Sequence, residues 1–333
     1  MRAAPSVAAM SGRSARRRAG VWARLWPIVA ALALHPLLCA FDLTHHVVPP
    51  EEIRDGGPAK DAIPAVRDPQ FVKAGQAAFL EANDKVIGVV LEGRARAYPI
   101  KILNWHEVVD DSIEGTPLAV TFCPLVQGAA VYRRAVGDGQ TLVFGVSGKL
   151  YQSNLVLYDV NTQSLWSQFD GRALTGPLAG QKLSAIPSTV TTWEAWSKKH
   201  PATDVLGIDT GYTRDYGVDP YWGYEHGAEI VSPVTHLDER LDAHEIVLGI
   251  SADGQDEAFP LSKLAGAPML LRVRLGGTNL TINYDAGSGA ARASAAGERI
   301  PAYEGYWFAW AAFHPGTEIW SPAPKAGRRA AAN

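Results

Sequence analysis

Two stretches of this chain occur twice, in the same order, and this internal repeat is the feature that most constrains the fold. The segment 86–103 (VIGVVLEGRARAYPIKIL) matches 247–264 (VLGISADGQDEAFPLSKL) at six of 18 positions. The segment 193–205 (WEAWSKKHPATDV) matches 307–319 (WFAWAAFHPGTEI) at six of 13 positions. Because chance gives roughly one identity in each comparison, we interpret the pattern as two copies of one structural unit.

The first repeated stretch predicts a β-hairpin. Apolar alternation leads to a turn at Gly93 or Gly254, and a second short strand then ends at a proline.

The second repeated stretch predicts a short helix. Thr191 and Glu194 form a capping-box pattern before it, and Pro201 ends it. Trp193 and Trp196 share one face, which we expect to pack on the sheet. Lys198, Lys199 and His200 occupy the last turn, where cations suit the helix dipole. We expect His200 and its counterpart His314 to be structural residues at helix ends.

The copies differ in length, because copy one carries 47 more residues between its two matched stretches. We therefore expect a β-rich α+β fold with two unequal tandem repeats, each a sheet unit closed by a short Trp-bearing helix, packed as one globule. The expected divisions are an export signal (1–40), an extended arm (41–83), repeat 1 with the site (84–206), an aromatic connecting region (207–243), repeat 2 as scaffold (244–322) and a disordered tail (323–333).

The N-terminus has the pattern of an export signal. Arg13, Arg16, Arg17, Arg18 and Arg24 precede an apolar run over 27–38 that is too short to span a bilayer. Cleavage after Ala40, a lipid anchor at Cys39, a twin-arginine route and an uncleaved anchor all stay open. We expect a periplasmic or extracellular protein that meets a membrane only through an uncleaved signal.

Composition excludes one class of partner and sharpens the cysteine question. The net charge of −3 does not point to a nucleic-acid partner, because such a partner would need a basic face. Since Cys39 lies inside the signal, the mature chain keeps Cys123 as its single thiol and forms no internal disulfide. An unpaired thiol after export is either deeply buried or functional.

The longer insert of copy one is where we expect a site. It contains NWHEVVDD, VTFCPL, FGVSGKLYQSNLVLYD, SLWSQ and GPLAG, and TTWEAWSKKHP follows. With the run 306–313, these motifs closely resemble the family called domain of unknown function 3179, over roughly residues 60–322. The resemblance implies no established activity. Many members look to carry a second Cys three residues after the first, where this chain has Val126.

Cys123 and His106 are the candidate catalytic pair. Cys123 follows an apolar strand and precedes Pro124, which forces the chain out of the sheet. A thiolate with His106 as base would be a nucleophile, and the same two side chains could form half of a copper or zinc site. Glu107 or Asp159 could orient the base. Cys123 and His106 also have an ordinary structural interpretation, as a buried core thiol and a hydrogen-bonded side chain. No CxxC or HExxH spacing supports a stronger metal prediction.

Polar and aromatic residues suggest how a ligand would be held. Ser147, Tyr151 and Asn154, with Ser153 between them, crowd a Gly-flanked loop that suits polar recognition or a hydrogen-bonded turn. Arg214 lies in the aromatic segment 211–224, which could close a pocket over a sugar or an anion, or simply pack as a crossover between the copies. We expect His226, His236 and His244 on the surface.

Three functions remain open from sequence. The first is an envelope enzyme or metal-handling protein with a Cys/His-centred pocket in repeat 1, taking a small molecule or a metal ion. The second is a non-catalytic module that binds a small polar or sugar-like ligand. The third is a structural or interaction protein of the envelope.

Overall fold

The computed structural model describes residues 41–322, apart from 138, 226 and 228. The predicted export signal 1–40 and tail 323–333 lie outside the described residues. Within the described part, strand residues far outnumber helical ones, so the β-rich α+β class is confirmed. None of the helices in that part is long and apolar enough to cross a membrane.

The first repeated stretch forms the predicted hairpin and then a helix. Val86 pairs with Pro99 and Leu91 with Arg94, so the turn falls at Glu92 and Gly93. The hairpin lies in a five-stranded sheet of order β14-β3-β4-β15-β2. Its members and helices are β2 (Phe71–Lys73), η2 (Ala74–Gln76), β3 (Lys85–Leu91), β4 (Arg94–Pro99), α1 (Ile100–His106), β14 (Ser188–Thr192), α2 (Trp193–Lys199) and β15 (Asp204–Leu206).

The later copy of these stretches forms a second hairpin inside a seven-stranded sheet of order β23-β17-β16-β22-β7-β6-β5. Val247 pairs with Pro260 in the register that Val86 and Pro99 adopt. The elements are β5 (Val108–Ile113), β6 (Thr116–Cys123), β7 (Gly128–Arg133), β16 (Ile246–Ala252), β17 (Gln255–Pro260), α4 (Leu261–Leu264), β22 (Tyr303–Tyr306), α5 (Trp307–Phe313) and β23 (Glu318–Ile319).

The strand groups β14-β3-β4-β15 and β22-β16-β17-β23 have the same order and directions. In each, the first two pairings are antiparallel and the last is parallel. Each group carries an indole that lies directly on a glycine of the hairpin, Trp196 on Gly88 and Trp310 on Gly249. Each indole N–H donates to a threonine, at 3.1 Å to Thr203 and 2.9 Å to Thr317.

The packing predicted for the helices is confirmed, but one cap is not. Trp193 and Trp196 are buried, and His200 and His314 are the C-caps of α2 and α5. The predicted cap Thr191 is wrong, because Thr192 accepts the N–H of Ala195. Alternation along β14 directs Thr191 into the buried face, which leaves Thr192 free to cap the helix.

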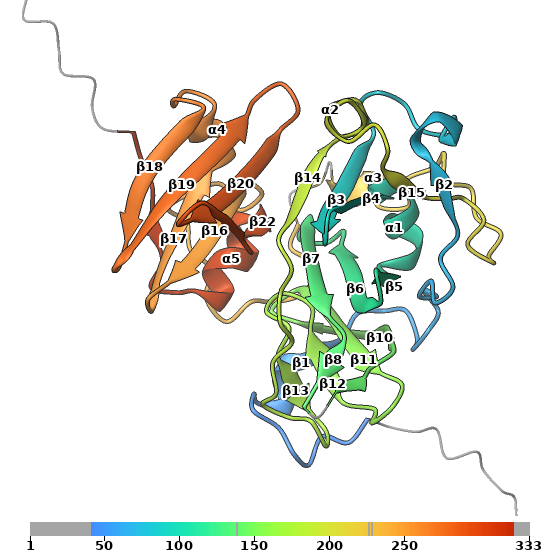
Figure 1. The fold of residues 1–333 in the computed structure, drawn as a ribbon. Helices are drawn as coiled ribbons and strands as arrows, with labels where there is room; N and C mark the ends of the chain where they lie inside the picture. Colours follow the sequence, from blue (N-terminus) through green and yellow to red (C-terminus); the bar gives the residue numbers. More distant parts are fainter. Residues whose placement is uncertain (1–40, 138, 226, 228, 323–333) are drawn as a thin grey trace, which may run out of the picture. The chain divides into compact units, whose positions relative to one another are not determined.

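The interval between α1 and β14 contributes most of a third sheet, which lies below the first in Figure 1 and has the order β1-β10-β11-β12-β13. The arm 41–83 supplies its edge strand, and Ile53 pairs with Tyr151. The elements are η1 (Pro50–Glu52), β1 (Ile53–Asp55), β10 (Phe144–Tyr151), β11 (Asn154–Asp159), β12 (Leu165–Ser167) and β13 (Ala173–Thr175), with the small pair β8 (Ala135–Val136) and β9 (Gln140–Thr141) nearby.

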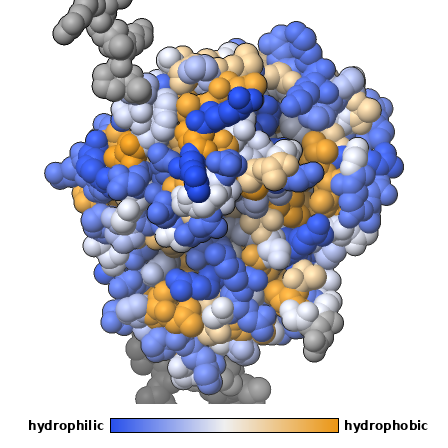
Figure 2. Space-filling model, turned by 60° about the vertical axis from the view of Figure 1, so that its left-hand side comes forward, coloured by the Kyte–Doolittle hydropathy of each residue, from blue (hydrophilic) through white to orange (hydrophobic). Residues whose placement is uncertain are grey.

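A four-stranded antiparallel sheet follows α4 in the chain, and the connecting region contains one short helix. The strands are β18 (Leu270–Leu275), β19 (Thr278–Asp285), β20 (Ala290–Ala295) and β21 (Glu298–Ile300), and the helix is α3 (Trp222–Glu225). On the face seen in Figure 2, apolar residues occur in separate patches between hydrophilic ones.

The indole-on-glycine contact predicts a large effect of a single methyl group. A Cβ at Gly88 or Gly249 would overlap the indole ring of Trp196 or Trp310. We expect Gly88→Ala and Gly249→Ala each to lower the free energy of unfolding by about 1–3 kcal/mol, because a close-packed contact cannot absorb the volume. Urea unfolding measures this. Gly75→Ala is the control, since nothing lies within 4 Å of its added Cβ, and an equal loss in all three variants would contradict the prediction.

Candidate functional site

Cys123 ends β6 beneath the surface of the molecule. It pairs with Gly128 across a turn that begins at Pro124, so the predicted departure from the sheet at Pro124 is confirmed. Its exposed fraction is 1%, and it belongs to a core cluster with Phe144, Leu155 and Trp166.

One backbone N–H is hydrogen-bonded to the sulfur. The Leu155 N–H donates to Sγ at 3.4 Å, and the N–H groups of Leu125 and Val126 also act on Sγ in the direction that favours a thiolate. Burial outweighs these donors and raises the Cys123 pKa to about 12, with a further upward contribution from Glu107. The resting form is therefore the neutral thiol.

Glu107 is the carboxyl group whose charge acts on the Cys123 thiol. It follows α1 in the left-handed conformation, φ 58°, and its backbone carbonyl accepts the N–H of Phe122 at 2.9 Å. This bond places Glu107 beside the end of β6. Burial raises the pKa of Glu107 to about 7, although the hydroxyl of Tyr221 donates to it at 2.9 Å and lowers the pKa. Glu107 thus changes charge near neutral pH.

His106 has both ring nitrogens occupied elsewhere. Nδ1 lies 2.7 Å from the Pro64 carbonyl oxygen, which only accepts, so Nδ1 carries the proton. Nε2 then accepts from the Tyr216 hydroxyl at 2.7 Å, and Tyr216 accepts from Thr210 at 2.6 Å. No hydrogen bond joins His106 to Cys123 in the described chain. Burial, and then Arg214, lower the His106 pKa.

The aromatic segment 210–224 lies over the end of α1 and contacts every residue of the NWHE motif. Tyr216 and Tyr221 reach His106 and Glu107, and Tyr224 donates to the Leu125 carbonyl at 2.7 Å. The Arg214 guanidinium lies 5.9 Å from the ring centroid of Trp105. The remaining bonds are Asn104 Nδ2 to Asp219 Oδ1 (3.0 Å) and Trp105 Nε1 to the Val218 carbonyl (3.1 Å). We call this segment the aromatic cover.

Asn154 is the one predicted ligand-binding residue near the thiol, since Leu155 is its chain neighbour. Its Nδ2 donates to Gln168 Oε1 at 3.0 Å, and Gln168 in turn donates to the Gly128 carbonyl at 3.1 Å. Among the described residues, the Asn154 Oδ1 atom and the Tyr303 hydroxyl are buried without a hydrogen-bond partner. A Cβ at Gly128 would lie 3.5 Å from that hydroxyl, so polar capacity remains unused beside the Cys123–Gly128 pair.

The other predicted residues serve the third sheet. Ser147 donates to the Val156 carbonyl and accepts the Lys149 N–H at 3.0 Å, across an irregularity between β10 and β11. The Tyr151 ring packs edge-on against Phe313 at 5.6 Å. Asp159 accepts from Trp166 Nε1 at 2.9 Å, so it does not orient a base.

Metal binding has no ready ligand set here. Over the described residues, no three or more His, Cys, Asp and Glu side chains are grouped so that they could hold an ion. Copper or zinc at Cys123 and His106 would lack the third protein ligand that such sites normally have.

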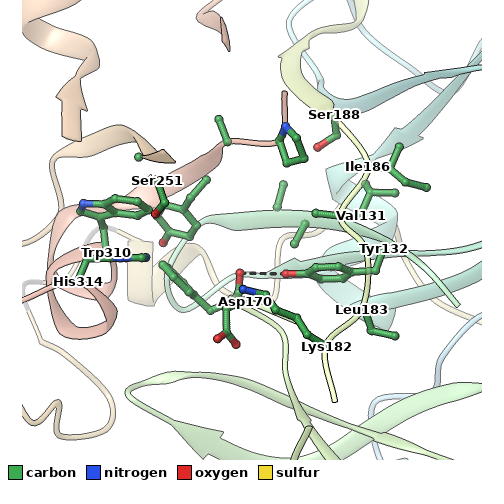
Figure 3. Close-up of a pocket in the computed structure, with 18 residues that line it drawn as sticks. Val131, Tyr132, Asp170, Lys182, Leu183, Ile186, Ser188, Ser251, Trp310 and His314 are labelled. Atoms are coloured by element: carbon green, nitrogen blue, oxygen red, sulfur yellow. Dashed lines mark hydrogen bonds between the residues drawn. The ribbon is translucent and has the colours of Figure 1, made fainter. Parts of the chain in front are cut away.

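A pocket of about 240 Å³ lies elsewhere, between β7 and the 182–188 segment on one side and β16 and α5 on the other. Figure 3 shows Trp310 and His314 facing Tyr132, with Asp170 and Lys182 between them. Tyr303 also lines the pocket. Its hydroxyl belongs to the unpaired polar atoms near Cys123, so one side chain borders both places.

Sequence reasoning missed this pocket and the role of Gln168, Glu107 and Tyr303. Gln168 lies within the motif SLWSQ, and Glu107 directly follows His106, so both stood in segments already singled out. Tyr303 lies 180 residues after Cys123 and had no such signal.

Comparison with known proteins places most of the chain in one family model. The model described as "Protein of unknown function (DUF3179)" matches residues 60–298. No curated protein and no solved structure matches the chain.

The His106 bonds predict a pH dependence of stability. Since the folded state holds the His106 pKa below 6.5, the unfolded chain binds a proton first as the pH falls. The stabilisation by neutral His106 is therefore complete above pH 6.5 and is lost below it. In urea unfolding at pH 7.5 and 5.5, we expect His106→Asn to cost less at the lower pH. The same cost at both values would contradict the lowered pKa.

Proposed function

The chain belongs to the DUF3179 family of proteins of unknown function, and from its buried polar centre we propose that it is an enzyme that uses the Cys123 thiol. In this proposal Glu107, and not His106, accepts the thiol proton. The sulfur then adds to a carbonyl carbon of a small substrate. The C–S bond forms as the C=O π bond opens onto oxygen, and Glu107 returns the proton to that oxygen. The observation that carries the proposal is a buried thiol that accepts the Leu155 N–H at 3.4 Å and feels the charge of one carboxyl group, Glu107, whose pKa is raised to about 7.

Each part has a chemical role. Backbone N–H groups stabilise negative charge on sulfur without adding a titrating side chain. A base works best when its pKa lies near the working pH, and the Glu107 pKa of about 7 meets this condition. The unpaired Asn154 Oδ1 and Tyr303 hydroxyl supply an acceptor and a donor for substrate groups.

Access to the thiol requires movement. The aromatic cover is held by three hydrogen bonds from tyrosine hydroxyls, to Glu107, His106 and Leu125, and by two more from the side chains of Asn104 and Trp105. Such bonds contribute about 1 kcal/mol each to stability. Opening of this segment without unfolding of the rest of the protein is therefore the route to Cys123 that we propose.

The segments by which the chain resembles its family also support this centre. NWHE supplies Glu107, VTFCPL supplies Cys123, YQSN supplies Asn154 and SLWSQ supplies Gln168. These segments are distant in the chain, yet their side chains and backbone meet around the Cys123–Gly128 pair.

A second candidate is a small polar or sugar-like ligand in the pocket of Figure 3. The specific observation is its mixed wall, with Phe169, Tyr303 and Trp310 as apolar surfaces and Asp170 and Lys182 as charged groups. Aromatic faces beside charged and hydroxyl groups suit polar ring-shaped molecules. This function needs no reaction at Cys123.

Two further proposals concern origin and location. We propose that the two strand groups derive from one duplicated unit, and the shared strand order, hairpin register and indole-on-glycine contact support this.

We also propose export of the protein, supported by the arginine cluster before the apolar run 27–38.

Alkylation tests the thiol proposal. In the full chain with Cys39→Ser, iodoacetamide should modify Cys123 in the native state, and the rate should rise about tenfold around pH 7 as Glu107 ionises. Glu107→Gln should remove that step, and Tyr221→Phe should speed the reaction by loosening the aromatic cover. Mass spectrometry follows the adduct.

Cys123→Ser gives the background of this experiment, and His106→Asn is the matched comparison that should keep the pH step. If modification occurs only at the rate of global unfolding in urea, the thiol has no native access and the proposal fails. Stoichiometric zinc or copper in the purified protein would favour the metal-handling alternative instead.

A ligand panel tests the pocket. We expect a monosaccharide, amino acid or hydroxy acid at millimolar concentration to raise the melting temperature by about 2 °C or more. Asp170→Asn and Lys182→Gln should abolish that shift, while Lys263→Gln, outside the pocket, should keep it. A panel without any shift, or a shift that both pocket variants retain, would count against this function.

A further inference from the structure

A separate hollow lies between the end of α2 and the hairpin of β20 and β21. Its volume is about 430 Å³. Four basic side chains line it, Lys199 and His200 from the end of α2 and Arg292 and Arg299 from the hairpin. The two elements come together because β14 and β20 lie side by side (Figure 1). We call this hollow the basic cleft.

The cations of the basic cleft are oriented by neutral partners. Arg292 Nε donates to Thr189 Oγ1 at 3.2 Å. Arg299 Nη2 donates to the Ser188 carbonyl at 2.6 Å and to Thr189 Oγ1 at 2.9 Å. These acceptors fix the guanidinium groups but neutralise no charge.

Three cations of the basic cleft have no carboxylate partner, and one arginine nitrogen has no hydrogen-bond acceptor. Within the described part of the chain, Lys199, Arg292 and Arg299 form no ion pair with a carboxylate within 4.0 Å. The Arg299 Nε atom is buried and has no hydrogen-bond partner there. A buried donor without an acceptor is costly, and a bound anion would supply the acceptor.

Nearby acidic groups offset the charge only in part. Glu298 is exposed at the wall of the cleft, and Glu304 and Asp285 act on Arg292. Burial raises the Glu304 pKa to about 8, so this group is mostly neutral at pH 7. The basic groups repel one another, which lowers the pKa of Lys199 and His200 beyond the effect of burial.

We propose that the basic cleft binds the phosphate group of a small phosphorylated molecule, as a site separate from Cys123. The arginine fork matches the oxygens of a phosphate, and a lysine adds a mobile point charge. The cleft volume lies in the usual range for sites of small organic ligands and exceeds what a bare ion fills. Sulfate esters share this chemistry.

Calorimetric titration of the full chain tests the proposal with inorganic phosphate and glycerol phosphate, at constant ionic strength set with sodium chloride. We expect both to bind, and glycerol phosphate to bind more tightly. Lys199→Gln and Arg292→Gln should each weaken binding roughly tenfold or more, as the loss of a charge-assisted hydrogen bond predicts.

Lys198→Gln is the matched control. Lys198 is the residue just before Lys199 in the same helix, is exposed and does not line the cleft. Its affinity should equal that of the unchanged chain. Equal affinity for both probes would assign the site to the free ion. Absence of heat for both probes up to 10 mM, or equal binding by the Lys199 and Lys198 variants, would overturn the proposal.

Discussion

An indole ring lying flat on a hairpin glycine occurs in both halves of this protein, and much of the architecture follows from it. Trp196 on Gly88 and Trp310 on Gly249 bring a short helix down onto its sheet. The indole N–H then bonds to a threonine just after the helix, where the chain enters the strand that pairs in parallel with the hairpin. Since each helix has only seven residues, it is stabilised mainly by this packing and little by helix propensity.

The two helices that the indoles hold on their sheets, α2 and α5, each contribute side chains to one of the two hollows. α5 presents Trp310 and His314 to the pocket of Figure 3, and the end of α2 presents Lys199 and His200 to the basic cleft. Both hollows lie along the line where the earlier strands of the chain meet the later ones. Residues from both halves are needed to form either hollow, so neither half alone would bind at these places.

The thiol centre follows a different principle. Glu107 and Cys123 are buried at the cost of their charged forms, which is why both pKa values are raised. The Leu155 N–H at the sulfur and the Tyr221 hydroxyl at Glu107 offset part of that cost. This cost is the one expected of the thiol chemistry that we propose for these two groups. The neutral, fully bonded His106 next to them has the opposite character and holds the aromatic cover in place.

Local pattern alone determined the hairpins, the tryptophan-bearing helices, the strand that ends at Cys123 and the segment in which the polar centre lies. Alternation, glycine turns and proline ends act over a few residues, so they can be read without tertiary contacts. The cap at Thr192 and the partner of Cys123 could not be read in this way. Which of two adjacent threonines faces the helix, and whether His106 or Glu107 faces the thiol, depends on which side chain the neighbouring strands bury. The two hollows were decided only by tertiary structure, because their walls join residues far apart in the chain, such as Val90 and Arg299 at the basic cleft.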